Sequence, residues 1–126
     1  MADGEGIGRR VVDAILAGEG ARVADLLAGD AVFHSPVTDY QGAERVTTVL
    51  GAAGAVVRDA RATSVLERAG ETVALFAAEV QGRPVQGVLR VVAGDDGRAR
   101  DITLWVRPLK TLLVGIEEMK ARLSAA

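Results

Sequence analysis

Four side chains are the candidates for acid–base chemistry: His34, Asp39, Tyr40 and Asp101. His34 is the only histidine, and its reference pKa of about 6.5 suits proton transfer near neutral pH. Asp39 and Tyr40 follow Pro36 in a loop, where a carboxylate and a phenol can contact a ligand. Structural roles are the alternative: a surface histidine bonded to backbone or water, an aspartate that favours a turn, and a tyrosine at the core rim.

The composition excludes several other kinds of site. The chain has no cysteine, which rules out disulfides, thiol nucleophiles and cysteine metal sites, and a single histidine rules out a multi-histidine metal site. We therefore expect no cofactor and no metal. The net charge is -2, and the arginines alternate with acids instead of forming a basic stripe, so we expect no nucleic-acid partner.

Membrane association and export are also not expected. No apolar run approaches the roughly 18 residues of a membrane-spanning helix, and residues 1–6 lack the basic-then-apolar order of a signal peptide. The sequence therefore predicts a cytoplasmic protein without a membrane partner.

Apolar periodicity and turn signals predict the order helix, helix, strand, helix, four strands, helix. Pro36 should end the first strand, a loop should follow over 37–42, and Pro108 should open the last helix. The expected helices are 7–17, 23–29, 43–53 and 109–123, and the expected strands are 31–35, 56–67, 72–80, 85–92 and 98–106.

The short turns at 69–70, 81–82 and 94–97 indicate that the last four strands form an antiparallel meander. Strands of eight to ten residues are roughly 25–35 Å long and coil strongly. We therefore expect one α+β domain over 1–126: a cone-shaped, curved antiparallel sheet against three helices of the N-terminal half, plus a C-terminal helix. One end of such a sheet commonly stays open, and a pocket there is the default ligand site.

Four parts of the chain resemble the SnoaL-like and nuclear transport factor 2-like superfamily, which has a ketosteroid isomerase-like fold. They are the run 17–36, the motif Tyr40-Gln41-Gly42 that leads into the third helix, the strand meander and the segment 103–109. The similarity covers nearly the whole chain. It implies the fold more specifically than a function, because the superfamily includes isomerases, cyclases, epoxide hydrolases and transport adaptors.

The catalytic residues of the ketosteroid isomerases do not carry over. The resemblance places Ser35 where these enzymes keep the aspartate base, Val11 where they keep a tyrosine, and Gly87 where they keep a neutral carboxylic acid. A serine hydroxyl cannot replace a carboxylate as general base near neutral pH. The sequence therefore predicts that steroid-isomerase chemistry is absent.

Two other activities of the superfamily are only partly represented. An epoxide hydrolase of this kind needs an arginine between two carboxylates, and Arg90 has Asp101 on a neighbouring expected strand but no second carboxylate. A cyclase would need His34 or Asp101 to face the cavity. We expect Glu79 to form a surface ion pair with Arg90, and Asp95-Asp96 to form a solvated turn.

Strand parity assigns side chains to faces, because neighbouring residues alternate. If Ser35 faces the pocket, as the resemblance implies, Phe33 also faces it and His34 points away. In the last strand, family register favours an inward set of Ile102, Leu104 and Val106, and puts Trp105 outside in a homodimer interface. A register shift of one residue would instead place Trp105 and Asp101 in the pocket.

The expected pocket is mainly apolar and suits a small apolar organic ligand. The leading hypothesis is a small-molecule-binding domain with enzymatic activity undecided; the alternatives are a cyclase-, isomerase- or epoxide-hydrolase-like enzyme and a non-catalytic dimeric interaction module with a filled interior. A cavity above about 300 Å³ with converging polar groups would favour an enzyme, and an apolar cavity would favour binding. The expected pocket-lining residues are Val11, Ile15, Phe33, Ser35, Tyr40, Gly87, Leu89, Ile102, Leu104 and Val106.

Overall fold

The structure is a computed structural model that describes residues 2–125 of the 126-residue chain, and the side chains of residues 6–124. Met1, part of the N-terminal segment considered above, and Ala126 lie outside the described residues. Within the described part, no helix is both long enough and apolar enough to span a bilayer. The elements are α1 (Ala2–Leu16), the 3-10 helix η1 (Gly20–Asp25), β1 (Leu27–His34), β2 (Asp39–Gln41), α2 (Ala43–Val56), β3 (Arg58–Arg68), β4 (Glu71–Val80), β5 (Arg83–Ala93), β6 (Ala99–Arg107) and α3 (Leu109–Ala125).

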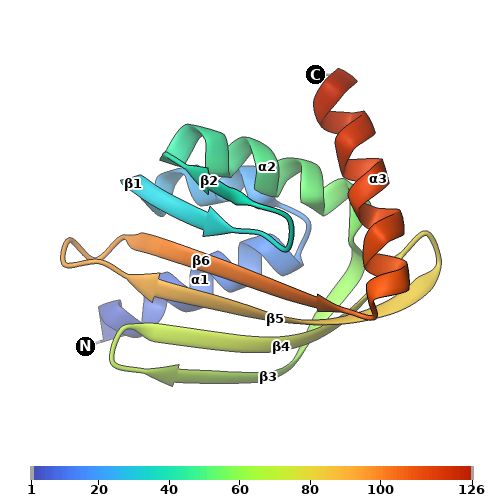
Figure 1. Ribbon diagram of the computed structural model, residues 1–126. Helices are drawn as coiled ribbons and strands as arrows, with labels where there is room; N and C mark the ends of the chain where they lie inside the picture. The colour runs from blue at the N-terminus through green and yellow to red at the C-terminus, as the bar shows by residue number, and fades with distance from the viewer. Residues whose placement is uncertain (1, 126) are drawn as a thin grey trace.

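The strands form one curved sheet in the order β2-β1-β6-β5-β4-β3 (Figure 1). The predicted α+β class and the antiparallel meander of β3 to β6 are confirmed. The sheet departs from the expected antiparallel pattern at one pair, because β1 lies parallel to β6. A parallel pair requires a long crossover connection, and here α2 and the meander supply it. Helices α1 and α2 cover one face, and α3 stands across one end (Figure 1).

Three boundaries differ from the sequence prediction around β1. The second helix is the 3-10 helix η1, and Leu27 to Asp30, expected at the end of a helix, belong to β1. Leu27 pairs with Ala99 of β6, a contact that local periodicity cannot reveal. The expected loop 37–42 contains β2, which pairs with β1.

Helix α2 also continues past its predicted end at residue 53. Gly54 lies inside it, and a Cβ there would be 2.9 Å from the carbonyl oxygen of Gly18. The glycine therefore permits close packing of α2 on the α1–η1 connection and does not stop the helix.

The helix-covered face of the sheet, here called the inner face, is formed by alternate residues of each strand. Rows of paired residues cross β4, β5 and β6 on this face, for example Ala74, Leu89 and Leu104. The adjacent row of the opposite, outer face is Leu75, Val88 and Trp105. The fully buried core includes Val11, Val12, Val23, Phe33, Val46, Leu89, Val91 and Ile102.

Candidate functional site

A cavity of about 240 Å³ lies on the inner face where α3 crosses the end of the sheet. Helices α2 and α3, the inner face of the sheet and the β1–β2 turn form its walls. Its volume falls just below the usual range of about 300–1,000 Å³ for ligand pockets. The lining residues are Phe33, Ser35, Pro36, Val37, Tyr40, Val49, Ala53, Val56, Val57, Val80, Leu104, Val106, Leu112, Gly115, Ile116, Met119, Lys120 and Leu123.

Helix α3 supplies one wall through a stripe at helical spacing, from Leu112 through Ile116 and Met119 to Leu123. Gly115 lies in the middle of this stripe. A Cβ at Gly115 would meet Val80 Cγ1 at 3.5 Å and Val56 Cγ1 at 3.7 Å, which are ordinary van der Waals distances. The helix therefore closes the cavity against both β4 and α2 while leaving space beside its own backbone.

The cavity wall contains few polar groups. Ser35 Oγ donates to the carbonyl oxygen of Thr38 at 2.7 Å, and accepts from the backbone N–H groups of Val37 at 3.2 Å and Thr38 at 3.0 Å. These bonds hold the β1–β2 turn and occupy the hydroxyl. The Tyr40 ring stacks on Phe33 with centroids 6.2 Å apart. Among the described residues that line the cavity, none is a histidine or a carboxylate, and Lys120 is the one charged side chain.

His34 lies on the outer face, between two carboxylates. Its Nδ1 is 2.8 Å from Asp39 Oδ1 of β2, and its Nε2 is 3.3 Å from Asp101 Oδ2 of β6. The hydrogen bond to Asp39, supported by the bond to Asp101, raises the pKa of His34 above its ordinary value, although partial burial opposes the rise. The protonated ring donates from both nitrogens and so ties β1 to its two neighbouring strands.

The arrangement around His34 does not suit a metal ion. The two carboxylates contact opposite nitrogens of the ring, so the potential ligands do not converge on one point. Across the part of the chain that the structure describes, no group of three or more His, Cys, Asp or Glu residues is placed to hold a metal.

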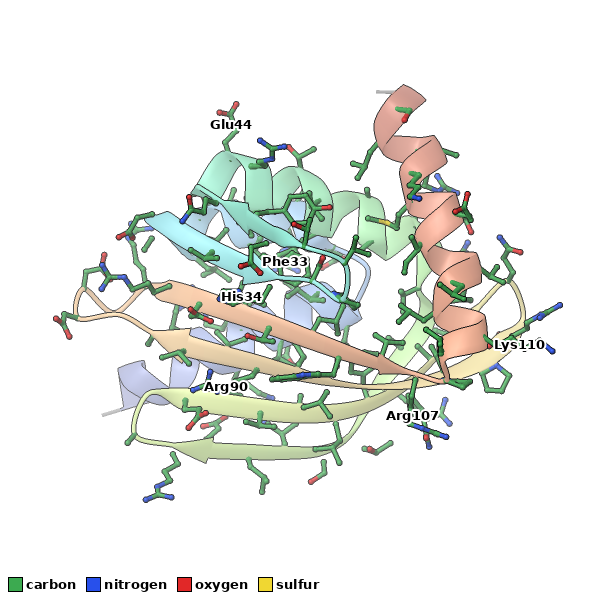
Figure 2. The ribbon with its side chains drawn as sticks, viewed as in Figure 1. Phe33, His34, Glu44, Arg90, Arg107 and Lys110 are labelled. Atoms are coloured by element: carbon green, nitrogen blue, oxygen red, sulfur yellow. The ribbon has the colours of Figure 1, made fainter. Side chains whose placement is uncertain are left out.

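The acid–base candidates therefore divide between the two faces of the sheet. His34, Asp39 and Asp101 meet on the outer face, whereas Tyr40 lines the cavity. Figure 2 labels His34 and Phe33, which are consecutive on β1 and so belong to opposite faces.

Two positions at which the resemblance implies isomerase residues, Val11 and Gly87, lie in tightly packed surroundings. Val11 is fully buried in the core. At Gly87, a Cβ would lie 2.4 Å from Phe76 Cζ and 2.7 Å from the carbonyl oxygen of Trp105. The Phe76 ring therefore covers the backbone of β5 at the position where the resemblance implies an acid in the isomerases.

The predicted pocket residues occupy three environments. Phe33, Ser35, Tyr40, Leu104 and Val106 line the cavity. Val11, Leu89 and Ile102 are buried in the solid core, Ile15 packs against that core, and Gly87 lines a separate depression of about 360 Å³ beside Trp105. The prediction omitted the walls from α2 and α3, although the apolar stripe of α3 was visible in the sequence.

The outer face carries Trp105, 52% exposed, beside Leu75, which is 41% exposed. The register therefore puts neither Trp105 nor Asp101 in the cavity. Arg90 pairs with Glu71, which lies two residues from its β4 partner Val73, whereas Glu79 lies six residues away, opposite Arg58 and Pro84. Asp101 contacts His34 instead.

Comparison with solved structures gives extensive matches. A steroid delta-isomerase from Pseudomonas aeruginosa is 30% identical, with 99% of this chain and 94% of that chain covered and a TM-score of 0.89. An uncharacterized protein with a cystatin-like fold from Silicibacter pomeroyi is 24% identical over 92% of this chain and 84% of that chain, with a TM-score of 0.86. A nuclear transport factor 2-like protein of unknown function from Mesorhizobium loti is 17% identical over 85% and 93%, with a TM-score of 0.74. No family model and no curated protein matches the chain.

Proposed function

The chain belongs to the SnoaL-like and nuclear transport factor 2-like superfamily, with a ketosteroid isomerase-like fold, and on this premise we propose that it binds a small, largely apolar organic molecule in the cavity beside α3. The observation that carries the proposal is the cavity wall, which is formed almost entirely by aliphatic and aromatic side chains. Such a wall stabilises an apolar ligand by removing its surface from water, at about 25 cal/mol per Å².

The isomerisation named for the Pseudomonas aeruginosa neighbour is not part of this proposal. Ketosteroid isomerase chemistry needs a carboxylate base and two acidic donors, and the resemblance places Ser35, Val11 and Gly87 at these positions. The hydroxyl of Ser35 is already committed to the β1–β2 turn. The other acid–base groups, around His34, are separated from the cavity by the sheet itself, so no observation favours the cyclase or hydrolase alternatives.

Two copies of the chain are proposed to pair through the outer face. A symmetric dimer buries the same patch on each copy, so the patch must be compatible with itself. The exposed apolar side chains Leu66, Leu75 and Trp105 can meet their own counterparts, and the nearby pair of Arg90 with Glu71 offers charges of both signs for reciprocal contacts. This homodimer, like the predicted cytoplasmic location, stays a prediction.

Titration with the uncharged apolar fluorophore N-phenylnaphthylamine tests the binding proposal. We expect the wild-type protein to enhance its fluorescence in a saturable manner, and Gly115→Leu to abolish the signal by placing a side chain in the cavity. Ser124→Leu adds the same side chain at an exposed position of α3 and should leave binding unchanged. Wild-type protein that shows no saturable binding, or binding that survives Gly115→Leu, contradicts the proposal.

Native mass spectrometry of the purified protein provides a second measurement. It reports any co-purified small molecule together with the number of subunits. We expect a dimer that carries an organic ligand of low polarity.

A further inference from the structure

We propose that the natural ligand is an amphipathic anion, whose apolar body fills the cavity and whose anionic head group binds the ammonium of Lys120. This inference rests on the proposed binding function and names the chemical class of its ligand. It predicts a preference opposite to that of the apolar wall alone, because aliphatic side chains disfavour a charged head group relative to a neutral one.

The first support is the position of Lys120 on α3. The cavity-lining residues of this helix begin at Leu112 and end at Leu123, so the cavity follows the helix axis. Lys120 is about 12 Å along that axis from Leu112, at a rise of 1.5 Å per residue. Between them, Gly115, Ile116 and Met119 provide only apolar surface. An extended apolar chain beside this stripe therefore ends near a single positive charge.

The second support is the lack of any competing charge in the wall. Of the described residues that line the cavity, only Lys120 is charged, and none carries a carboxylate. Ser35 cannot take over the role of head-group donor, because its hydroxyl already donates to Thr38. A second cation lies close to one wall, since the Arg45 guanidinium is 6.0 Å from the centre of the Tyr40 ring.

The third support is the weak ion pair that the Lys120 ammonium forms. Its Nζ is 3.6 Å from Glu117 Oε2 one helical turn earlier, and the side chains of Lys120 and Glu117 are 66% and 76% exposed. Exposed pairs of this kind contribute little. A ligand carboxylate can therefore replace Glu117 at small cost, while the aliphatic stem of the lysine extends the apolar wall.

Competition against bound N-phenylnaphthylamine by octanoate and by octanol tests the inference. The two molecules share an apolar chain and differ in head-group charge at neutral pH. We expect the wild-type protein to bind octanoate more tightly than octanol. Lys120→Met should lower the affinity for octanoate about three- to fivefold and leave the affinity for octanol unchanged. Added salt should lower the affinity for octanoate but not the affinity for octanol.

The chain offers a matched control, since its only two lysines, Lys110 and Lys120, both lie on α3. Lys110 is exposed at the start of the helix and does not line the cavity (Figure 2). Lys110→Met should therefore change neither affinity. Glu117→Gln removes the ion pair with the Lys120 ammonium and should raise the affinity for octanoate, which is opposite in sign to the effect of Lys120→Met.

The outcomes separate this inference from the function on which it rests. Equal binding of octanoate and octanol, or an octanoate affinity that is insensitive to Lys120→Met, overturns the anionic head group and leaves the apolar binding site intact. If neither compound displaces the fluorophore and the fluorophore itself does not bind, the binding function fails as well. Equal effects of the two lysine substitutions point to the net charge of the protein and also contradict the inference.

Discussion

The two faces of the sheet are built from the same strands and differ in almost every chemical property. On the inner face, β1 and β6 present Phe33, Leu104 and Val106 to an apolar cavity. On the outer face, the residues next to them are His34, which bonds two carboxylates, and the exposed Trp105. One residue along a strand is enough to change the environment from an apolar interior to a charged surface.

This difference separates the proton-transferring groups of the molecule from its cavity. A catalytic pocket needs its proton-transferring groups within hydrogen-bond reach of the substrate. Here the histidine and its carboxylates are on one side of a continuous backbone layer and the cavity is on the other. Four predictions test this division.

The largest effect should follow an attempt to place an acid on the inner face. Gly87→Asp forces a Cβ into the Phe76 ring and leaves a carboxylate without a partner, so the free energy of unfolding should fall by at least about 3 kcal/mol. Gln86→Asp, one residue away on the outer face, should cost less than about 1 kcal/mol. Urea unfolding measures both changes.

The same pair of residues permits a check of the proposed cause. If the Phe76 ring causes the loss, combining Phe76→Ala with Gly87→Asp should cost less than the sum of the two single changes. Strict additivity would mean that Phe76 is not the obstacle. If Gly87→Asp does not lower the free energy of unfolding, the proposed contrast between the two faces is wrong.

The next effect concerns association through the outer face. Trp105→Lys should raise the dimer dissociation constant by at least about 30-fold, which corresponds to about 2 kcal/mol, because a central aromatic residue is replaced by a charge. Leu113→Lys changes an equally exposed apolar residue on α3 and should not alter association. Sedimentation velocity over a concentration series measures the constants. Dimers that persist in Trp105→Lys, or a wild-type monomer, would rule out this interface.

A smaller effect should distinguish the cavity wall at α3 from the close contact between η1 and α2. Gly115→Ala should raise the free energy of unfolding by about 0.5–1 kcal/mol, since alanine is the better helix former and its Cβ has room. Gly20→Ala should instead destabilise the protein, because its Cβ would lie 2.3 Å from the carbonyl oxygen of Leu50. Thermal unfolding of the two variants should therefore shift in opposite directions, and a shift in the same direction would contradict the difference in packing.

The smallest effect is the pH dependence of the stabilisation that His34 contributes. A raised pKa means that the folded state binds the proton more tightly, so the stabilisation is fully present below the unfolded pKa of about 6.5 and is lost as the pH rises through the folded pKa. The wild type should exceed His34→Gln in unfolding free energy by less than about 1 kcal/mol in acid, with the difference vanishing at higher pH. Urea unfolding between about pH 5 and 9 measures it. A difference that grows with pH would show that the sign is wrong.

Much of this division could be predicted from local pattern. Alternation along β1 separates Phe33 from His34, and the same rule separates Leu104 from Trp105. The turn signals predicted the meander because each hairpin is local in sequence. These inferences need only neighbouring residues.

The parts that could not be predicted depend on contacts between distant segments. The bond from His34 to Asp101 joins residues 67 positions apart through the parallel β1–β6 pair. The stripe on α3 predicted a buried helix face, but periodicity does not identify the element that the face contacts. For this reason, Ile15 was expected in the cavity wall where Ile116 and Met119 are found.

The parallel pairing of β1 with β6 also has a consequence for synthesis. At about 5–20 residues per second, a ribosome needs roughly 4–15 s between completing β1 and completing β6. During this interval β1 lacks β6, the strand that joins it to the meander. The cavity forms later still, because α3, its final wall, follows β6. A nascent chain therefore completes this cavity only as α3 emerges.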